Sequence, residues 1–104
     1  MPTKNSSDID VLFAAAVERS ASDLHLVAGK PALLRMNGDL APVDDAVLDA
    51  DRVRDLVYSI ITDEERARFE RDKELDFAHQ IAGGKRFRIN IHWEKGNVAL
   101  AART

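Results

Sequence analysis

The chain has 104 residues, with 15 lysines and arginines against 18 aspartates and glutamates, so its formal net charge is −3. This length suits a single domain, and a hydrophobic content of 45% is ordinary for a globular protein. The absence of cysteine excludes disulfides, thiol catalysis and cysteine-ligated metal sites. The acidic balance argues against nucleic-acid binding, and no apolar run approaches the roughly 20 residues of a membrane helix. We therefore expect a cytoplasmic protein that binds no nucleic acid.

Motifs that mark enzymes are missing from the sequence. The glycines occupy positions 29, 38, 83, 84 and 96, and none belongs to a phosphate-binding GxxxxGK[ST] or GxGxxG pattern. HExxH, GxSxG and DxDxDG patterns do not occur either. We expect no catalytic residue and no metal site in this chain.

The first half of the chain predicts one helix followed by strands. Residues 1–6 are expected to be a disordered leader before a domain spanning 7–104. Apolar residues at i, i+3, i+4, i+7 and i+8 predict a helix over about 7–19. This stripe consists of Ile9, Leu12, Phe13, Ala16 and Val17.

Two short strands and a hairpin are expected next. Asp23 to Val27 alternates polar and apolar residues, and Ala32 to Met36 forms a second strand. Asn37-Gly38 is the pair that favours a type I′ hairpin turn. The returning arm, 39–43, contains Pro42 and should lie at a sheet edge or stop early.

Two further helices are predicted in the middle of the chain. The acidic stretch 44–51 is expected to cap a helix whose apolar stripe is Val53, Leu56, Val57, Ile60 and Ile61. Thr62 and Glu65 form a capping box, which predicts a third helix over about 63–72.

The remaining sequence predicts strands at 74–81, 86–94 and 98–103, with turns at 82–85 and 95–97. The expected fold is α+β: a mainly antiparallel sheet of about five to six strands, with three helices over its apolar face. The last strand runs to the final residues without a capping element, which favours a domain from a longer protein.

The strand at 86–94 carries the main candidate site. Arg86 and Arg88 share one face, opposite to Phe87 and Ile89. If residues 95–97 form a hairpin, antiparallel pairing brings Arg103 beside them. Three guanidiniums could then converge on phosphate or carboxylate groups. The alternative is an ordinary solvated sheet face with long charged side chains.

Histidines and clustered carboxylates offer weaker signals. His25, His79 and His92 show no ligand spacing, and we expect His25 to be a hydrogen-bonded residue beneath or beside the first helix. The acidic residues before the second helix are explained by its dipole. They are Asp44, Asp45, Asp49 and Asp51.

Five segments in register resemble the N-terminal domain of the PilT group of type IV pilus retraction motors, relatives of the type II secretion ATPase GspE. They are Ala21–Leu26 (ASDLHL), Pro31–Leu40 (PALLRMNGDL), Glu74–Ala78 (ELDFA), Arg86–Asn90 (RFRIN) and Glu94–Arg103 (EKGNVALAAR). The resemblance covers nearly all of residues 7–104.

This resemblance implies a PAS-like fold placed before a RecA-like ATPase core that is absent from this chain. It implies a bacterial homo-hexamer active in twitching motility, with each N-terminal domain packed on the core of its own and of the neighbouring subunit. ATP and Mg belong to the complete protein, and Arg88, Arg103 and Arg86 are the matching phosphate-contacting arginines. An inner-membrane pilus platform protein is the implied partner, which would make the machine peripheral to that membrane.

The sequence departs from the family pattern at three places. His92 stands where the family usually has an aromatic residue, Glu94-Lys95 replaces Gln-Arg, and Ala102 replaces Phe before Arg103. Without the core, the chain is not expected to hydrolyse ATP by itself. The competing hypothesis is a free-standing PAS-like ligand-binding or scaffold module. That module predicts a cavity beneath the sheet, whereas the motor domain predicts a packed core.

Overall fold

The structure, a computed structural model, describes residues 4–104. Over these residues the chain forms three helices and one six-stranded antiparallel sheet, which confirms the expected α+β class. In chain order the elements are α1 (Lys4–Glu18), β1 (Asp23–Leu26), β2 (Lys30–Met36), β3 (Asp39–Leu48), α2 (Ala50–Tyr58), α3 (Asp63–Asp72), β4 (Glu74–Gln80), β5 (Arg86–Glu94) and β6 (Asn97–Arg103).

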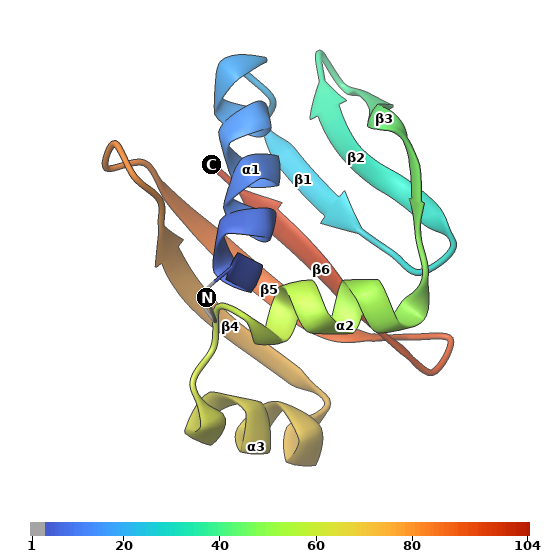
Figure 1. The fold of residues 1–104 in the computed structure, drawn as a ribbon, viewed down its shortest axis with the longest axis vertical. Helices are drawn as coiled ribbons and strands as arrows, with labels where there is room; N and C mark the ends of the chain where they lie inside the picture. Colours follow the sequence, from blue (N-terminus) through green and yellow to red (C-terminus); the bar gives the residue numbers. More distant parts are fainter. Residues whose placement is uncertain (1–3) are drawn as a thin grey trace.

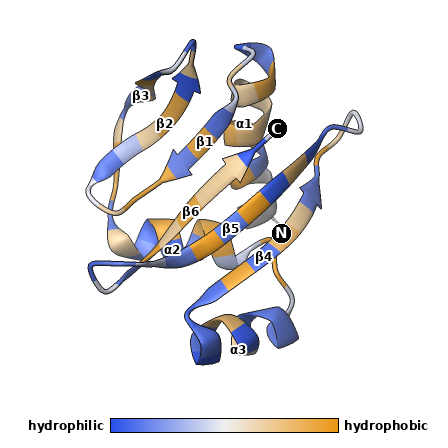
Figure 2. Cartoon of the chain, turned by 180° about the vertical axis from the view of Figure 1, so that it is seen from behind, coloured by the Kyte–Doolittle hydropathy of each residue, from blue (hydrophilic) through white to orange (hydrophobic). Residues whose placement is uncertain are grey.

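The strands lie in the order β3-β2-β1-β6-β5-β4, so the first and last strands of the chain are neighbours at the centre of the sheet. Helices α1 and α2 cover one face, and α3 lies at the β4 end (Figure 1). Seen from behind, the strands lie in front of the helices (Figure 2). We call this second face the open face of the sheet.

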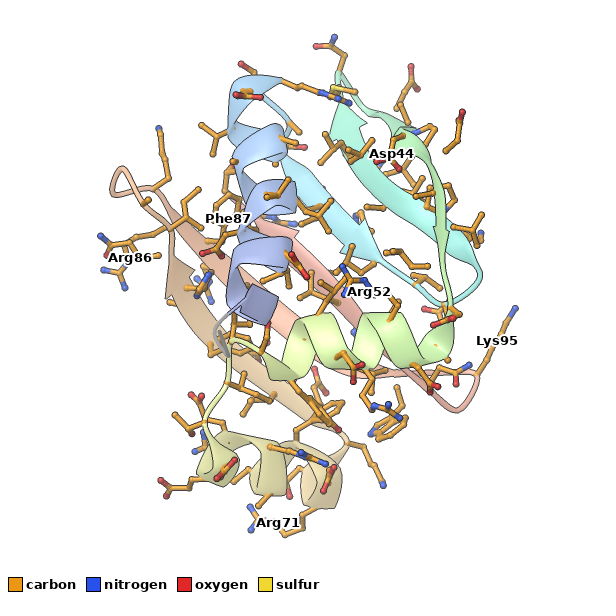
Figure 3. The ribbon with its side chains drawn as sticks, viewed as in Figure 1. Asp44, Arg52, Arg71, Arg86, Phe87 and Lys95 are labelled. Atoms are coloured by element: carbon orange, nitrogen blue, oxygen red, sulfur yellow. The ribbon has the colours of Figure 1, made fainter. Side chains whose placement is uncertain are left out.

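Helix α1 contributes the predicted stripe to the core. Ile9, Phe13 and Ala16 are fully buried. The ring centroid of Phe13 lies 4.6 Å from that of Phe87 on β5, a distance within the favourable range for aromatic pairs. Figure 3 shows Phe87 beside α1, whereas the neighbouring Arg86 extends outward from the sheet. The alternation of β5 therefore separates core from surface as predicted.

Helix α2 begins after Asp49, whose side chain accepts a hydrogen bond of 2.8 Å from the backbone N–H of Arg52. Its buried residues are Val53, Leu56 and Val57. The helix ends at Tyr58, so Ile60 and Ile61 lie beyond it as half-buried residues of the connection to α3. The prediction that these two residues continue the helical stripe was wrong.

Helix α3 has the predicted capping box. Glu65 donates its backbone N–H to the hydroxyl of Thr62 at 3.1 Å, and Thr62 donates its own to the Glu65 carboxylate at 2.9 Å. The fully buried Phe69 stacks on Trp93 with a centroid distance of 5.5 Å. One aromatic contact thus joins an otherwise charged helix to the sheet.

Two-residue turns set the strand register. Asn37 and Gly38 have φ values of 54° and 86°, and Lys95 and Gly96 have 53° and 82°, the positive angles that a type I′ turn requires. The second turn pairs Glu94 with Asn97. The same register, followed to the other end of this hairpin, pairs Arg88 with Arg103.

Strand β3 corrects a prediction about the acidic stretch. Pro42 does lie on an edge strand, but the strand continues to Leu48. An irregularity opposite Ala32 accommodates four residues, 43–46, between the pairs Leu33–Pro42 and Pro31–Val47. Asp44 accepts the backbone N–H of Ala46 at 2.9 Å within this bulge. Asp44 and Asp45 therefore belong to the strand, and Asp49 is the helix cap.

Helix α1 begins at Lys4, three residues before its predicted start. Residues 4–6 therefore belong to the helix and not to the predicted leader, and residues 1–3 lie outside the described part of the chain. Within that part, none of the helices has the length and apolar character needed to span a membrane.

Candidate functional site

Four charged side chains form one row across the open face. The backbone register places Arg35 of β2 opposite Asp23 of β1, Asp23 opposite Arg103 of β6, and Arg103 opposite Arg88 of β5. Directly opposite residues of neighbouring strands project from the same face. We call these four residues the arginine row.

Asp23 joins two of the arginines. Its carboxylate lies 3.2 Å from Nε of Arg35 and 3.5 Å from Nε of Arg103. Sequence reasoning missed both Asp23 and Arg35 as site residues. Asp23 and Arg35 join the site because β1 pairs with β6, and no local sequence pattern reveals that pairing.

Arg88 and Arg103 are brought together as predicted. Like charges directly opposite each other on neighbouring strands repel. Arg103 shares Asp23 with Arg35, whereas Arg88 has no side-chain hydrogen bond or ion pair among residues 8–104, the part of the chain whose side chains the structure describes. Arg86 is the first residue of β5, two residues before Arg88 and opposite Gln80, so it lies at the end of the face and outside the row.

The other half of the open face carries an amide network. Asn90 donates through its Nδ2 to Glu74 and to Asp76, both at 2.9 Å. Its Oδ1 lies 2.8 Å from Nδ1 of His92, and since an amide oxygen only accepts, His92 carries a proton on Nδ1. Asn90 therefore uses both amide protons and its oxygen within this network.

His25 corrects another expectation. It pairs with Leu33 and Ala101 on the open face, so it does not lie beneath α1. Its Nε2 atom is buried without a hydrogen-bond partner among the described residues. The alternation of Leu24 and Leu26 in the sequence already indicated this face, because both leucines are fully buried.

These residues surround a groove of about 720 Å³ that opens on the surface. Alanines 78 and 101 contribute only methyl groups to it, whereas long polar side chains rise around them. Its lining residues are Asp23, His25, Asp76, Phe77, Ala78, Arg88, Ile89, Asn90, Ala101, Ala102 and Arg103. The groove thus joins the arginine row to the amide network.

A second hollow lies between α2 and α3, and its polar side chains bind one another. Tyr58 donates to Glu70 at 3.1 Å, and Arg66 donates to the same carboxylate at 3.2 Å while lying 4.5 Å from the centre of the Tyr58 ring. Partial burial raises the pKa of Tyr58, and the hydrogen bond from Arg66 lowers the pKa of Glu70. These interactions hold the two helices together.

No group of three or more histidine and carboxylate side chains in the described part of the chain is arranged to hold a metal ion. His79 lies on the helix-covered face, where its Nε2 is 2.8 Å from the carboxylate of Asp10 on α1. This pair fastens α1 to the edge strand β4.

The sequence and fold of the chain are similar to those of known pilus ATPases. No protein-family model matches the chain. It is 36% identical over 97 residues to the type IV pilus retraction ATPase PilT of Pseudomonas aeruginosa, and 28% identical over 96 residues to the type IV pilus ATPase PilU of that organism. These matches cover 93% and 92% of the chain but only 28% and 25% of the two relatives.

The fold agrees with this match. A crystal structure of the pilus retraction motor PilT with bound ADP superposes with a TM-score of 0.82 at 32% identity. The superposition covers 89% of the chain and 27% of the motor. The chain therefore corresponds to about a quarter of these relatives, and it is a homologue of the N-terminal domain of PilT-type ATPases.

Proposed function

We propose that this chain is the N-terminal assembly and nucleotide-gating domain of a hexameric ATPase that retracts type IV pili in twitching motility. It packs on the RecA-like core of its own and of the neighbouring subunit, and it supplies Arg88 and Arg103 to the phosphates of ATP, with Arg86 as a third candidate. The complete protein is cytoplasmic and peripheral to the inner membrane, where the pilus platform protein is its partner.

The observation that carries this proposal is the opposition of Arg88 and Arg103. Two guanidiniums held side by side repel each other, and the carboxylate of Asp23 already serves Arg35 and Arg103. Such an arrangement lowers stability slightly but suits a polyanion, because planar guanidiniums bind phosphate oxygens in a bidentate manner. An anionic ligand would thus relieve a repulsion that the chain alone leaves in place.

The chemistry expected of these residues is electrostatic. During phosphoryl transfer, charge builds on the oxygens of the γ-phosphoryl group, and arginines delivered from a partner stabilise it. Because Arg88 and Arg103 project from a rigid sheet, movement of the whole domain against the core would bring them to the phosphates or withdraw them. We assign the contacts to Mg and to the base of the nucleotide to the core.

The competing hypothesis of a free-standing ligand-binding module predicts a cavity between the helices and the sheet. That region is filled by side chains that are fully or almost fully buried, among them Phe13, Phe87 and Leu100. The groove lies on the opposite face. Both observations support the motor domain.

Steady-state ATP turnover of the complete hexamer tests the proposal. Replacing a phosphate-binding arginine in other systems lowers the rate by a factor on the order of 10³–10⁵, and we expect a large loss in kcat for Arg88→Ala and Arg103→Ala. Arg88→Lys should recover little activity, because an ammonium does not reproduce the planar fork. Nucleotide binding should be largely retained.

Arg71→Ala is the matched control, because Arg71 is an exposed arginine on α3 that pairs with Asp72 at 2.9 Å, away from the open face. It should leave turnover unchanged. If Arg88→Ala and Arg103→Ala hydrolysed ATP at the wild-type rate with an intact fold, the arginine row would be a solvated surface and the proposal would be wrong.

A further inference from the structure

His25 lines the groove, and one of its ring nitrogens, Nε2, has no hydrogen-bond partner among the described residues. Asp23 is used by Arg35 and Arg103, and Asn90 is used by Glu74, Asp76 and His92. Among the described residues, two groups at the groove have no partner: the guanidinium of Arg88 and the Nε2 atom of His25. Both can donate a hydrogen bond, so both suit an acceptor that enters from outside.

These two groups border one hollow from opposite walls. His25 of β1 pairs with Ala101 of β6, and on the other side of β6 Arg103 pairs with Arg88 of β5. Strands β1 and β5 lie two strand spacings apart, about 10 Å, with the methyl group of Ala101 between them. Side chains as long as histidine and arginine can both reach a ligand seated over that alanine.

The burial of Nε2 makes the missing partner informative. Buried polar groups of side chains nearly always have a hydrogen-bond partner, and each exception calls for an explanation. Nε2 is shielded from water in this conformation, so water does not satisfy it. The side chain of Arg103, which lines the same groove, is 79% exposed and can turn toward an anion.

We propose that His25 is a further phosphate-binding residue, donating from Nε2 to the same chain of phosphoryl groups that Arg88 and Arg103 contact. This inference rests on the proposed function and deepens it, because it extends the site from the arginine row to strand β1. A bound polyanion also favours the doubly protonated imidazole, so proton uptake on binding is the signature expected of this contact. The charged groups that face this region are Asp23, Arg35, Asp76, Arg88 and Arg103.

The test measures binding of sodium tripolyphosphate to this chain by calorimetry at low ionic strength and pH 6.5, with sodium sulfate as the comparison anion. A hydrogen bond to a charged group corresponds to about ten- to a hundredfold in affinity. We expect that loss for His25→Ala, which removes the donor, and a smaller loss for His25→Gln, which keeps an amide donor but cannot be protonated. His92→Gln is the matched control, since His92 lies on the same face outside the groove lining.

Proton uptake supplies a second readout that a purely structural role would not move. Titrations in two buffers of different ionisation enthalpy count the protons taken up on binding, and His25→Gln should take up fewer than His92→Gln. The melting temperatures of all variants identify any loss of fold, and a His25→Asn variant repeats the test with a smaller amide if His25→Gln is unstable.

The outcomes separate this inference from the proposed function. If Arg88→Ala weakens binding and His25→Gln behaves like His92→Gln in affinity and proton count, the role of His25 is overturned while the arginine site stands. If the wild-type chain binds tripolyphosphate no better than sulfate, the His25 site is overturned. The proposed function is then decided by ATP turnover of the hexamer.

Discussion

The two faces of strand β5 differ in what holds their side chains in place. On the covered face, Phe87, Ile89 and Ile91 are buried under the helices, with at most 2% of each residue exposed. On the open face, Arg88 has no side-chain partner among the residues whose side chains are described, and Asn90 is saturated by three neighbours. The difference teaches that stability and the candidate function reside on one strand but one residue apart, so adjacent substitutions should have opposite signatures.

The largest effect is expected from Ile89→Asp. An unpaired carboxylate would enter the core at a cost of several kcal/mol, comparable to the whole stability of a domain of this size. The chain should lose its cooperative melting transition and its near-UV circular dichroism signal. A variant that melts like the wild type would mean that the two faces of β5 are assigned the wrong way round.

Phe13→Ala should have the next largest effect. Removing a fully buried ring that contacts Phe87 leaves a cavity between α1 and the sheet, and such substitutions cost about 3–5 kcal/mol. Urea unfolding of the two proteins measures the difference. Val11→Ala is the control, because Val11 lies on the same helix with 66% of its surface exposed and should change stability little.

The covered face was largely predictable from sequence, for a physical reason. Burial imposes periods of 3.6 on helices and of two on strands, and local signals such as Asn37-Gly38 and Thr62 with Glu65 mark the turns and caps. Strand β3 escaped this reasoning because Pro42 and two aspartates lie at an edge and in a bulge, where backbone donors need no partner. The end of α2 escaped it because Ile60 and Ile61 keep the apolar pattern after the helix has stopped.

The open face was only partly predictable. The Arg88–Arg103 pairing follows from a hairpin, which is a local feature, and was predicted. The positions of Asp23, Arg35 and His25 beside Arg103 depend on the pairing of β1 with β6, which lie more than 70 residues apart in the sequence. No local pattern encodes that pairing, and so the prediction from sequence missed Asp23 and Arg35, which complete the arginine row.

Asp23→Ala should give a smaller effect and separate stability from binding. The carboxylate offsets the charges of Arg35 and Arg103, and its loss should cost about 1 kcal/mol after allowance for the exposure of both arginines. The cost should shrink at high salt, since the repulsion among the arginines is then screened. The same variant should bind tripolyphosphate more tightly than the wild type. Weaker binding would mean that Asp23 positions Arg103 and does not compete with the anion.

The smallest effect on stability is expected from Arg88→Ala. The substitution removes a repulsion with Arg103 and also some contact of the aliphatic stem with its neighbours, so the change should stay within about 0.5 kcal/mol. Because the repulsion is screened by salt, the stability of the variant relative to the wild type should be greatest when urea unfolding is measured at low salt.

Arg88→Glu sharpens the comparison, since a carboxylate opposite Arg103 turns repulsion into attraction and should stabilise the chain by about 0.2–1 kcal/mol. A loss above about 1.5 kcal/mol for Arg88→Ala would show that Arg88 supports the fold, and the separation of the two faces would fail. If an Arg88 variant is more stable than the wild type and binds no polyphosphate, the repulsion between Arg88 and Arg103 is a cost in stability that accompanies anion binding.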